Sequence, residues 1–288
     1  MPVGLAGAGP WATRVHGPSL RRSQAVALTG VWARRYLAAQ DLARSVGTNA
    51  VESFPALLDA SGAISFTVPP SAQVELATEA ARAGKALLLE KPLGPDLASA
   101  RRLADAVAES GVISVMALIL RFAPEVQAFL DEVRRIRPIG GSATWISGGH
   151  NLATPRSPWR VAGGPLLDVG PHVLDLLEAA LGPIVGIRAH GRPSGWTGLL
   201  LDHAFGAHSE ASLCVPLPHN RPERFLRIVG EDGTVEIDLT RLAGDAFDHV
   251  VSAFAEAVRT TTPHPLDAAH GLHLQELIEA AHQQLDPA

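Results

Sequence analysis

Short apolar runs alternate with longer, alanine-rich amphipathic segments along residues 1–120. The short runs have the length of strands, and the longer segments place apolar residues at helical spacing. Because parallel strands need a crossover connection, usually a helix, this alternation predicts a parallel sheet. Strands are expected at residues 3–6, 26–32, 63–68, 86–90 and 112–118, with a weak one near Val51; helices are expected at 12–23, 36–46, 72–83 and 96–109, with a short helical turn at 54–59.

The pattern changes after Phe122, where one helix precedes a series of strands separated by turns rich in glycine and proline. Strands are expected at 141–147, 184–190, 199–205, 210–215, 224–229 and 234–238, and helices at 124–136, 171–181, 247–260 and 268–283. The sequence therefore predicts an α/β chain of two domains, residues 1–121 with a parallel sheet and residues 122–288 as an α+β unit.

Composition and charge exclude several classes of protein. The 288 residues are 47% hydrophobic and 18% charged, as in globular proteins. Lys and Arg number 24 against 29 Asp and Glu, and no basic run is longer than two residues, so nucleic acid is not an expected partner. No stretch approaches the ~18 apolar residues of a membrane span, and residues 1–10 do not have the pattern of a secretory signal. A single cysteine, Cys214, fits a reducing compartment, and we expect a cytoplasmic protein.

The first predicted strand runs directly into a glycine-rich turn with the pattern Gly7-x-Gly9-x-x-Ala12. Gly7 permits a tight turn, Gly9 lets the backbone approach a pyrophosphate, and a small residue at position 12 lets the following helix pack closely on the strand. The helix N-terminus offers unpaired N–H groups to phosphates. We expect this turn, with Pro10 and Trp11, to bind a dinucleotide; the alternative is a glycine turn that binds nothing.

The second predicted strand is followed by Ala33-Arg34-Arg35. At this place NAD-binding proteins have an acidic residue that contacts the adenosine ribose. No Asp or Glu occurs between Leu5 and Gln40. A small residue followed by two guanidinium groups leaves room for a 2′-phosphate and supplies donors to bind it. The sequence favours NADP, with NAD still possible; alternatively, both arginines are solvated residues at the start of a helix.

Further motifs extend over nearly the whole chain. They are residues 87–92 (LLLEKP), 121–124 (RFAP), 163–175 (GGPLLDVGPHVLD) and 267–271 (DAAHG). Together with the glycine turn, in this order and spacing, they resemble the Gfo/Idh/MocA family, the group of glucose–fructose oxidoreductase and inositol dehydrogenase. The resemblance implies a Rossmann domain over residues 1–121 and a C-terminal domain over residues 122–288. The latter would bind substrate and, through an open, mostly antiparallel sheet, form a dimer or tetramer.

The resemblance also implies roles for individual residues. Lys91 matches the lysine of the family's Glu-Lys-Pro motif, in which the Lys-Pro bond is often cis, and Asp168 and His172 match its Asp-x-Gly-x-His pattern. Histidine suits the base that removes a hydroxyl proton near neutral pH, and an ammonium group suits a developing alkoxide. Asp168 could orient the imidazole or a neighbouring substrate hydroxyl. Glu90 could support Lys91, and both are expected to contact the cofactor as well. As alternatives, Glu90 and Lys91 are a solvated pair and Asp168 caps a helix.

Flanking positions complete the predicted site. Residues 68–70 (Val68, Pro69 and Pro70) should border the cofactor at the end of the third long strand. Arg160 is a candidate for a contact with a polar substrate, with a surface role equally open. Gln73 stands where members of the family often carry histidine, so its contacts are expected to differ.

These observations predict an NAD(P)-dependent oxidoreductase that moves a hydride between the cofactor and a hydroxyl or carbonyl of a polyol, sugar or related molecule. Two alternatives remain: a nucleotide-binding sensor of the same fold without turnover, and a glycoside hydrolase that oxidises its sugar transiently. A metal site is not expected, because Asp168, His172 and Asp175 have no further ligands at a recognisable spacing.

Overall fold

A computed structural model describes residues 1–147, 157–215, 222–242 and 244–286. They divide into two compact units, each built from two segments of the chain. The first unit comprises Met1–Ile119 and Asp245–His273, and the second comprises Leu120–Gly244 and Leu274–Ala288. The predicted boundary at residue 121 lies close to Ile119, where the chain first passes from one unit to the other. Residues 245–273, however, pack with the first unit rather than the second.

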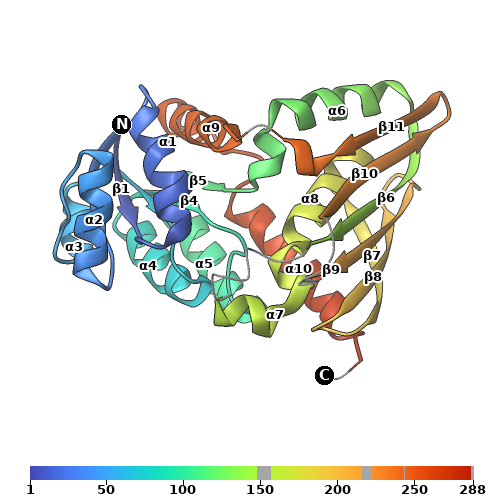
Figure 1. The fold of residues 1–288 in the computed structure, drawn as a ribbon, viewed down its shortest axis with the longest axis horizontal. Helices are drawn as coiled ribbons and strands as arrows, with labels where there is room; N and C mark the ends of the chain where they lie inside the picture. Colours follow the sequence, from blue (N-terminus) through green and yellow to red (C-terminus); the bar gives the residue numbers. More distant parts are fainter. Residues whose placement is uncertain (148–156, 216–221, 243, 287–288) are drawn as a thin grey trace. The chain divides into compact units, whose positions relative to one another are not determined.

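The first unit contains a five-stranded parallel sheet in the order β2-β1-β3-β4-β5. Figure 1 labels β1, β4 and β5 of this sheet. Its strands are β1 Pro2–Ala6, β2 Ala27–Trp32, β3 Ala63–Phe66, β4 Ala86–Leu89 and β5 Ser114–Met116. Every residue of β3 and β4 is buried, which explains why β4 is entirely apolar and why Ser65 is the one polar residue of β3. The five strands lie where the sequence predicts them, with β5 shorter, and the weak strand near Val51 is a single bridge between Val31 and Ala50.

Helices follow the strands as predicted. They are α1 Gly17–Arg22, α2 Tyr36–Val46, α3 Phe54–Asp59, α4 Pro70–Arg82, α5 Leu97–Ser110 and α9 Ala246–Thr260. Gly47 and Gly111 end α2 and α5 in the left-handed conformation, with φ of 72° and 65°, which glycine adopts without strain. None of the helices in the described chain is both long and apolar enough to span a membrane.

The helix after the glycine turn differs from the prediction of one helix over residues 12–23. Its first turn, Ala12–His16, is π-helical, and α1 continues from Gly17. A π-helical turn holds an extra residue, and such turns are frequent at functional sites. The turn buries both Ala12 and His16 completely.

Helix α9 explains why residues 245–273 belong to the first unit. It lies beside α1 (Figure 1), and its Phe247 and Phe254 are almost completely buried. Arg22 of α1 donates hydrogen bonds to both carboxylate oxygens of Asp248, the shortest at 2.8 Å. The sequence predicts this helix correctly, but helical periodicity carries no information on which sheet a helix covers.

The second unit contains a six-stranded sheet in the order β11-β10-β6-β9-β8-β7. Its strands are β6 Pro138–Ile146, β7 Ile184–Gly191, β8 Trp196–His203, β9 His208–Cys214, β10 Glu223–Gly230 and β11 Gly233–Asp238. Only the β6–β9 pair is parallel among these, so the sheet is mixed and mostly antiparallel. Its helices are α6 Pro124–Arg135, α7 Pro158–Asp168 and α8 Gly170–Leu181, while α10, Ala268–His282, is divided between the units.

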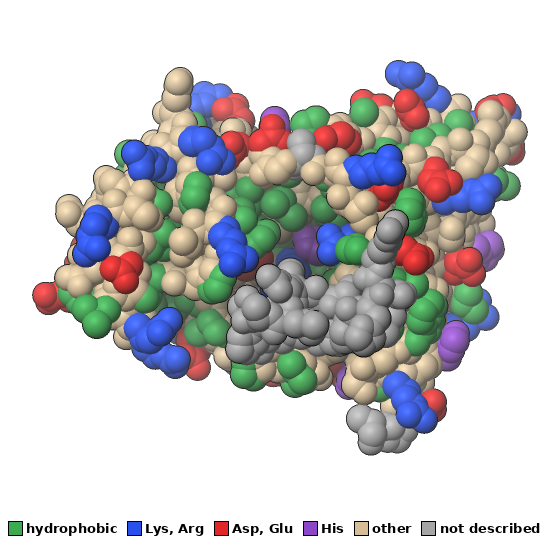
Figure 2. All heavy atoms as spheres, in the orientation of Figure 1, with side chains coloured by type: hydrophobic (Ala, Val, Ile, Leu, Met, Phe, Trp, Pro, Cys, Tyr) green, Lys and Arg blue, Asp and Glu red, His purple; other side chains and the backbone are tan. Residues whose placement is uncertain are grey.

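The two faces of this sheet differ in burial. Thr197, Leu199 and Leu201 of β8 are buried, whereas Trp196 and Leu200 on the opposite face are each 46% exposed. The buried face carries α8, which packs against β6 and β9. On the viewed face of the molecule, Lys and Arg side chains are interspersed with Asp and Glu (Figure 2).

Helix α7 was not predicted, because its sequence contains Gly163-Gly164-Pro165. The structure accommodates them through a kink at Gly164, whose φ of 60° and ψ of −166° are not helical. A Cβ atom at Gly164 would lie 1.7 Å from the carbonyl oxygen of Pro193, so this position requires glycine. Pro165 then begins the second half of the helix, where its missing N–H has no cost.

Candidate functional site

A cavity of about 460 Å³ lies in the first unit at the carboxyl ends of β1, β2 and β3. Three predicted groups of residues meet there: the glycine turn, the end of the second strand and the segment after β3. The lining residues are Gly7, Ala8, Gly9, Trp32, Ala33, Arg34, Arg35, Ala38, Thr67, Val68, Pro69, Ser71, Ala72, Glu75 and Leu76. The strand order changes direction between β1 and β3, and ligands of open α/β sheets bind at this point.

Gly7 and Gly9 have different roles in the turn. Gly7 has a φ of 116°, and a Cβ atom there would lie 2.4 Å from Oγ1 of Thr67. Its N–H donates to the carbonyl of Trp32 at 2.7 Å, which fixes the turn to β2. A Cβ atom at Gly9 would meet nothing within 4 Å, so its outer side faces open space. This geometry fits a dinucleotide: Gly7 shapes the turn, and Gly9 leaves a cradle for a pyrophosphate.

Arg34 and Arg35 line the same cavity and are exposed. Neither guanidinium forms an ion pair with any residue that the structure describes. Glu75 of α4 also lines the cavity. The rim therefore carries two cationic groups where a 2′-phosphate would lie in an NADP complex.

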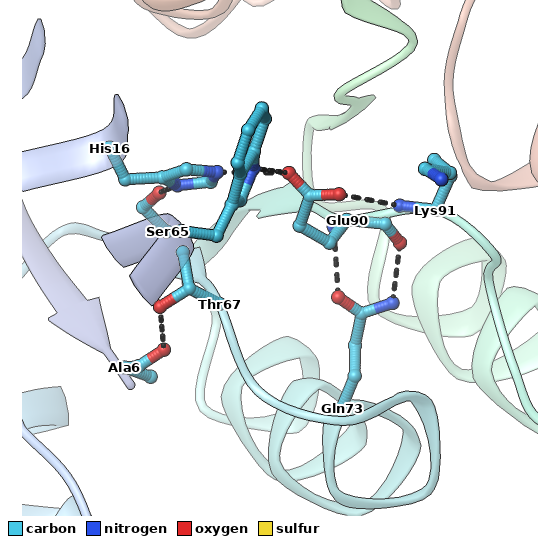
Figure 3. A network of polar contacts seen from close by, with 8 residues as sticks. Ala6, His16, Ser65, Thr67, Gln73, Glu90 and Lys91 are labelled. Carbon is cyan, nitrogen blue, oxygen red and sulfur yellow. Dashed lines mark hydrogen bonds and ion pairs between the residues drawn. The ribbon is translucent and has the colours of Figure 1, made fainter. Parts of the chain in front are cut away.

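Pro10, Trp11, Ala12, Pro70, Glu90 and Lys91 are not among the lining residues of this cavity. Several of them belong instead to a polar network around Glu90, at the end of β4 (Figure 3). Nε1 of Trp11 donates to Oε1 of Glu90 at 2.7 Å, and Nε2 of His16 lies 3.0 Å from the same oxygen. Oε2 of Glu90 accepts the backbone N–H of Lys91 at 3.2 Å. One carboxylate thus connects the glycine turn to the backbone that carries Lys91.

Gln73 of α4 fixes the same segment from the other side (Figure 3). Its amide accepts the N–H of Glu90 at 2.8 Å and donates to the Glu90 carbonyl at 2.7 Å. The same NH₂ group also lies 3.3 Å from the carbonyl oxygens of Pro92 and Leu93. An amide supplies donors and an acceptor side by side, which allows this double contact with one residue. The Lys91–Pro92 bond within the segment is cis, as expected.

His16 is fully buried and was not predicted as part of the site. Its Nδ1 lies 2.8 Å from Oγ of Ser65, and its ring packs on Phe247 with centroids 4.0 Å apart. Burial lowers the pKa of His16 from its ordinary value of 6.5, and the hydrogen bond with Glu90 partly offsets this effect. Because an ionised carboxylate only accepts hydrogen bonds, a neutral His16 carries its proton on Nε2 and accepts from Ser65. The sequence did contain a signal for the burial of His16. It lies four residues after Ala12, and this spacing places both residues near the inner side of the predicted helix.

The second unit contains the other candidate catalytic residues. Asp168 is the last residue of α7, and His172 lies in the first turn of α8; they are 4% and 7% exposed. The expectation that Asp168 precedes the helix is therefore only partly met, since it ends a helix of its own. Arg160, also in α7 rather than in a loop, forms an ion pair with Asp168. The predicted residues Arg160, Asp168 and His172 are thus near one another, while Lys91 belongs to the first unit.

Trp145 of the second unit lies next to His172, and Arg224 lies against Trp145. The indole of Trp145 stacks on the imidazole with ring centroids 5.9 Å apart and planes 9° apart. The guanidinium carbon of Arg224 lies 4.8 Å from the centre of the Trp145 ring. The sequence analysis missed both residues. The signal for Arg224 was its alternation with the apolar residues Leu226 and Ile228, which places an arginine on the buried face of a strand.

Asp175 is 1% exposed and accepts a hydrogen bond at 2.8 Å from Nη1 of Arg121. This contact gives the arginine of the RFAP motif a structural partner within the second unit. Among the described residues, no three His, Cys, Asp or Glu side chains gather in the manner of a metal site.

The sequence was compared with models of known protein families. Residues 1–118 match the family model described as "Oxidoreductase family, NAD-binding Rossmann fold", that of GFO_IDH_MocA. Residues 1–118 belong to the Gfo/Idh/MocA oxidoreductase family, and they form its NAD-binding Rossmann domain, as the motifs predicted.

Proteins similar to this chain cover nearly all of its length. The dTDP-3,4-didehydro-2,6-dideoxy-alpha-D-glucose 3-reductase of Streptomyces violaceoruber is 29% identical over 98% of this chain and 94% of the relative. The solved structure of GenD2 from gentamicin A biosynthesis, in complex with NAD, has a TM-score of 0.87 at 20% identity and covers 99% of this chain and 93% of its own. KijD10, a 3-ketoreductase from Actinomadura kijaniata solved with NADP and TDP-benzene, has a TM-score of 0.82 at 22% identity, covering 99% and 98%.

The environment of His16 predicts a pH dependence of stability. In the unfolded chain a histidine gains a proton as the pH falls through about 6.5, whereas the lowered pKa keeps His16 neutral in the folded protein. The unfolded state then binds more protons, so this residue lowers the free energy of unfolding as the pH falls below 6.5. The slope from one such group is at most about 1.4 kcal/mol per pH unit.

Urea unfolding of the wild type and of His16→Gln between about pH 5 and pH 8 measures this effect. On acidification, the free energy of unfolding should fall more steeply for the wild type than for the variant. Above pH 7 the two free energies should change with pH in parallel. His249→Gln, at an exposed position of α9, serves as the matched control. Parallel curves for the wild type and His16→Gln would contradict the prediction.

Proposed function

We propose that the protein transfers a hydride between a nicotinamide cofactor, preferably NADP, and a hydroxyl or carbonyl group of a sugar, polyol or related small molecule. The observation that carries this proposal is the Glu90 network. It connects the glycine turn, whose Gly9 faces open space, to the backbone of Lys91. A cofactor cradle and a candidate catalytic ammonium group are thereby fixed to the same sheet.

When bound, the nicotinamide supplies the chemistry of hydride acceptance or donation. The residues of the chain would then handle the proton and the charge. His172 would remove the proton from the substrate hydroxyl in the oxidative direction and return it in the reductive direction. Lys91 would stabilise negative charge on the reacting oxygen, and Asp168 with Arg160 would bind and orient the substrate.

The relatives support a sugar-like substrate. A reductase of a dTDP-linked keto-sugar aligns over nearly the whole chain, and KijD10 was solved with a TDP compound. The cofactors of the two structural relatives, NAD and NADP, leave the choice of coenzyme to the residues of this chain. Arg34 and Arg35 favour NADP.

Turnover is tested with a panel of polyols, sugars, keto-sugars and sugar nucleotides, each with NADP(H) and NAD(H), followed at the nicotinamide absorbance. Net oxidation or reduction of the cofactor is expected with at least one compound. Lys91→Ala and His172→Ala should each lower kcat by about 100-fold or more, as removal of a general acid–base group does. Lys85→Ala and His249→Ala are the controls.

Other outcomes of this panel identify the two alternatives. Hydrolysis of a glycoside without net change in the cofactor would replace the dehydrogenase with a redox-assisted hydrolase. Cofactor binding without any turnover, with Lys91→Ala and His172→Ala equal to the wild type, would favour a sensor.

Coenzyme preference is tested with Arg34→Ala and Arg35→Ala. Loss of a charge-assisted hydrogen bond to the 2′-phosphate should weaken NADP binding by about 10- to 100-fold and leave NAD binding nearly unchanged. Titration calorimetry measures both, with Arg44→Ala, an exposed residue of α2, as the control. Tighter binding of NAD than of NADP by the wild type would overturn the preference.

The open face of the six-stranded sheet is the surface through which we expect copies of the chain to associate. Trp196 and Leu200 expose large apolar side chains there. Light scattering after size exclusion should give the mass of a dimer or tetramer, and Leu200→Glu should shift it toward a monomer. Leu37→Glu, at a residue of α2 that is 74% exposed, should not; a monomeric wild type would refute the proposal.

A further inference from the structure

Arg224 of β10 occupies an unusual position for a charged residue. It shares the inner face of its strand with Leu226 and Ile228, which are 1% and 0% exposed. Across the sheet it pairs in register with Trp145 of β6. The arginine is half-buried, on the face of the sheet that also carries α8 and His172.

The polar atoms of this pair have no hydrogen-bond partners within the described chain. Nε of Arg224 and Nε1 of Trp145 are both buried N–H donors without an acceptor, and Trp145 is only 7% exposed. Burial lowers the pKa of the Arg224 guanidinium from its ordinary value, because water no longer solvates the cation fully. A buried donor without an acceptor costs free energy, and partial burial of a cation without a counter-charge adds to that cost.

Two other arginines of the second unit show the contrasting arrangement. Arg121 is paired with Asp175, and Arg160 is paired with Asp168. Arg224 has no carboxylate partner among the described residues, and its guanidinium lies over the face of the Trp145 ring. Stacking on an aromatic ring provides some attraction to the cation, but it satisfies none of the N–H donors.

The position of these donors relates them to the candidate base. The indole of Trp145 contacts both residues: its ring centre lies 4.8 Å from the guanidinium carbon of Arg224 and 5.9 Å from the ring centre of His172. A molecule that reaches His172 therefore has two unused N–H donors of the same sheet beside it. A guanidinium binds the oxygens of a phosphate or carboxylate with two parallel hydrogen bonds, and the indole N–H can add a third.

We infer that Arg224 and Trp145 form a subsite for an anionic group of the substrate, so that the substrate carries a phosphate, diphosphate or carboxylate rather than being a neutral polyol. The identification of the bound molecule as a substrate rests on the proposed oxidoreductase function. The binding of the anion does not, and it can be measured without turnover. The subsite makes Arg224 a residue that selects among sugar-like compounds.

The test uses the whole chain saturated with NADP, and each titration is repeated without NADP. The comparison distinguishes binding of a probe in the cofactor cavity from binding at the subsite. Titration calorimetry compares dTDP and glucuronate, the two sources of an anionic group, with neutral myo-inositol. The variants are Arg224→Gln and Arg224→Lys. Arg227→Gln, an exposed residue on the opposite face of β10, is the matched control. Thermal midpoints establish that each variant is folded.

At least one anionic probe should bind the wild type more tightly than myo-inositol. Arg224→Gln should weaken that binding by about 10- to 100-fold, the effect of losing a hydrogen bond to a charged group, while Arg224→Lys should restore part of it. Loss of dTDP binding identifies a phosphate group, and loss of glucuronate binding identifies a carboxylate. Equal binding by the wild type, Arg224→Gln and Arg227→Gln overturns the subsite.

Turnover separates failure of the subsite from failure of the proposed reaction. If an anionic sugar derivative is oxidised or reduced with the same KM by the wild type and by Arg224→Gln, the subsite is wrong and the oxidoreductase stands. If no compound is turned over but Arg224→Gln loses the anion, the subsite stands and the reaction is wrong.

Discussion

The carboxylate of Glu90 is the contact on which the first half of the candidate site depends. Its two oxygens accept from the indole of Trp11 and the backbone of Lys91, and it bonds to the buried ring of His16. The glycine turn follows β1 and the Lys91 segment follows β4, so two loops far apart in the sequence share one anion. Acidic residues in such a position have a structural task as well as a chemical one, because they set the direction of the neighbouring backbone.

The second unit holds its charges in a different manner. Arg121 and Arg160 each have an aspartate partner, which limits the cost of burying both charges. Arg224 rests on the Trp145 ring instead. A protein can retain a cation without a counter-charge when a bound ligand supplies that charge. The free energy of the ion pair with the ligand then contributes to selection of that ligand. The contrast among the three arginines thus separates positions that stabilise the fold from a position available for recognition.

Much of this structure could be predicted from the sequence, and the failures have physical causes. The strands and helices of the parallel sheet were found because burial on both faces and helical periodicity leave strong local patterns. Helix α7 was missed because Gly164 and Pro165 normally end helices; here a tertiary contact with Pro193 explains the glycine. His16 and Trp145 were missed because their significance comes from partners distant in the chain. The roles of Lys91, Asp168 and His172 remain proposals that came from a motif rather than from local physics.

The packing of α9 with the first unit has a consequence for biosynthesis. Its aromatic residues Phe247 and Phe254 belong to the core of a unit whose sheet is complete by residue 116. Well over a hundred residues separate β5 from this helix. Because a ribosome synthesises the chain from its N-terminus at about 5–20 residues per second, the helix emerges several seconds after the sheet. During that interval the nascent parallel sheet exposes an apolar surface that only a later segment can cover. Chaperones that bind such surfaces would meet this protein at that stage of its translation.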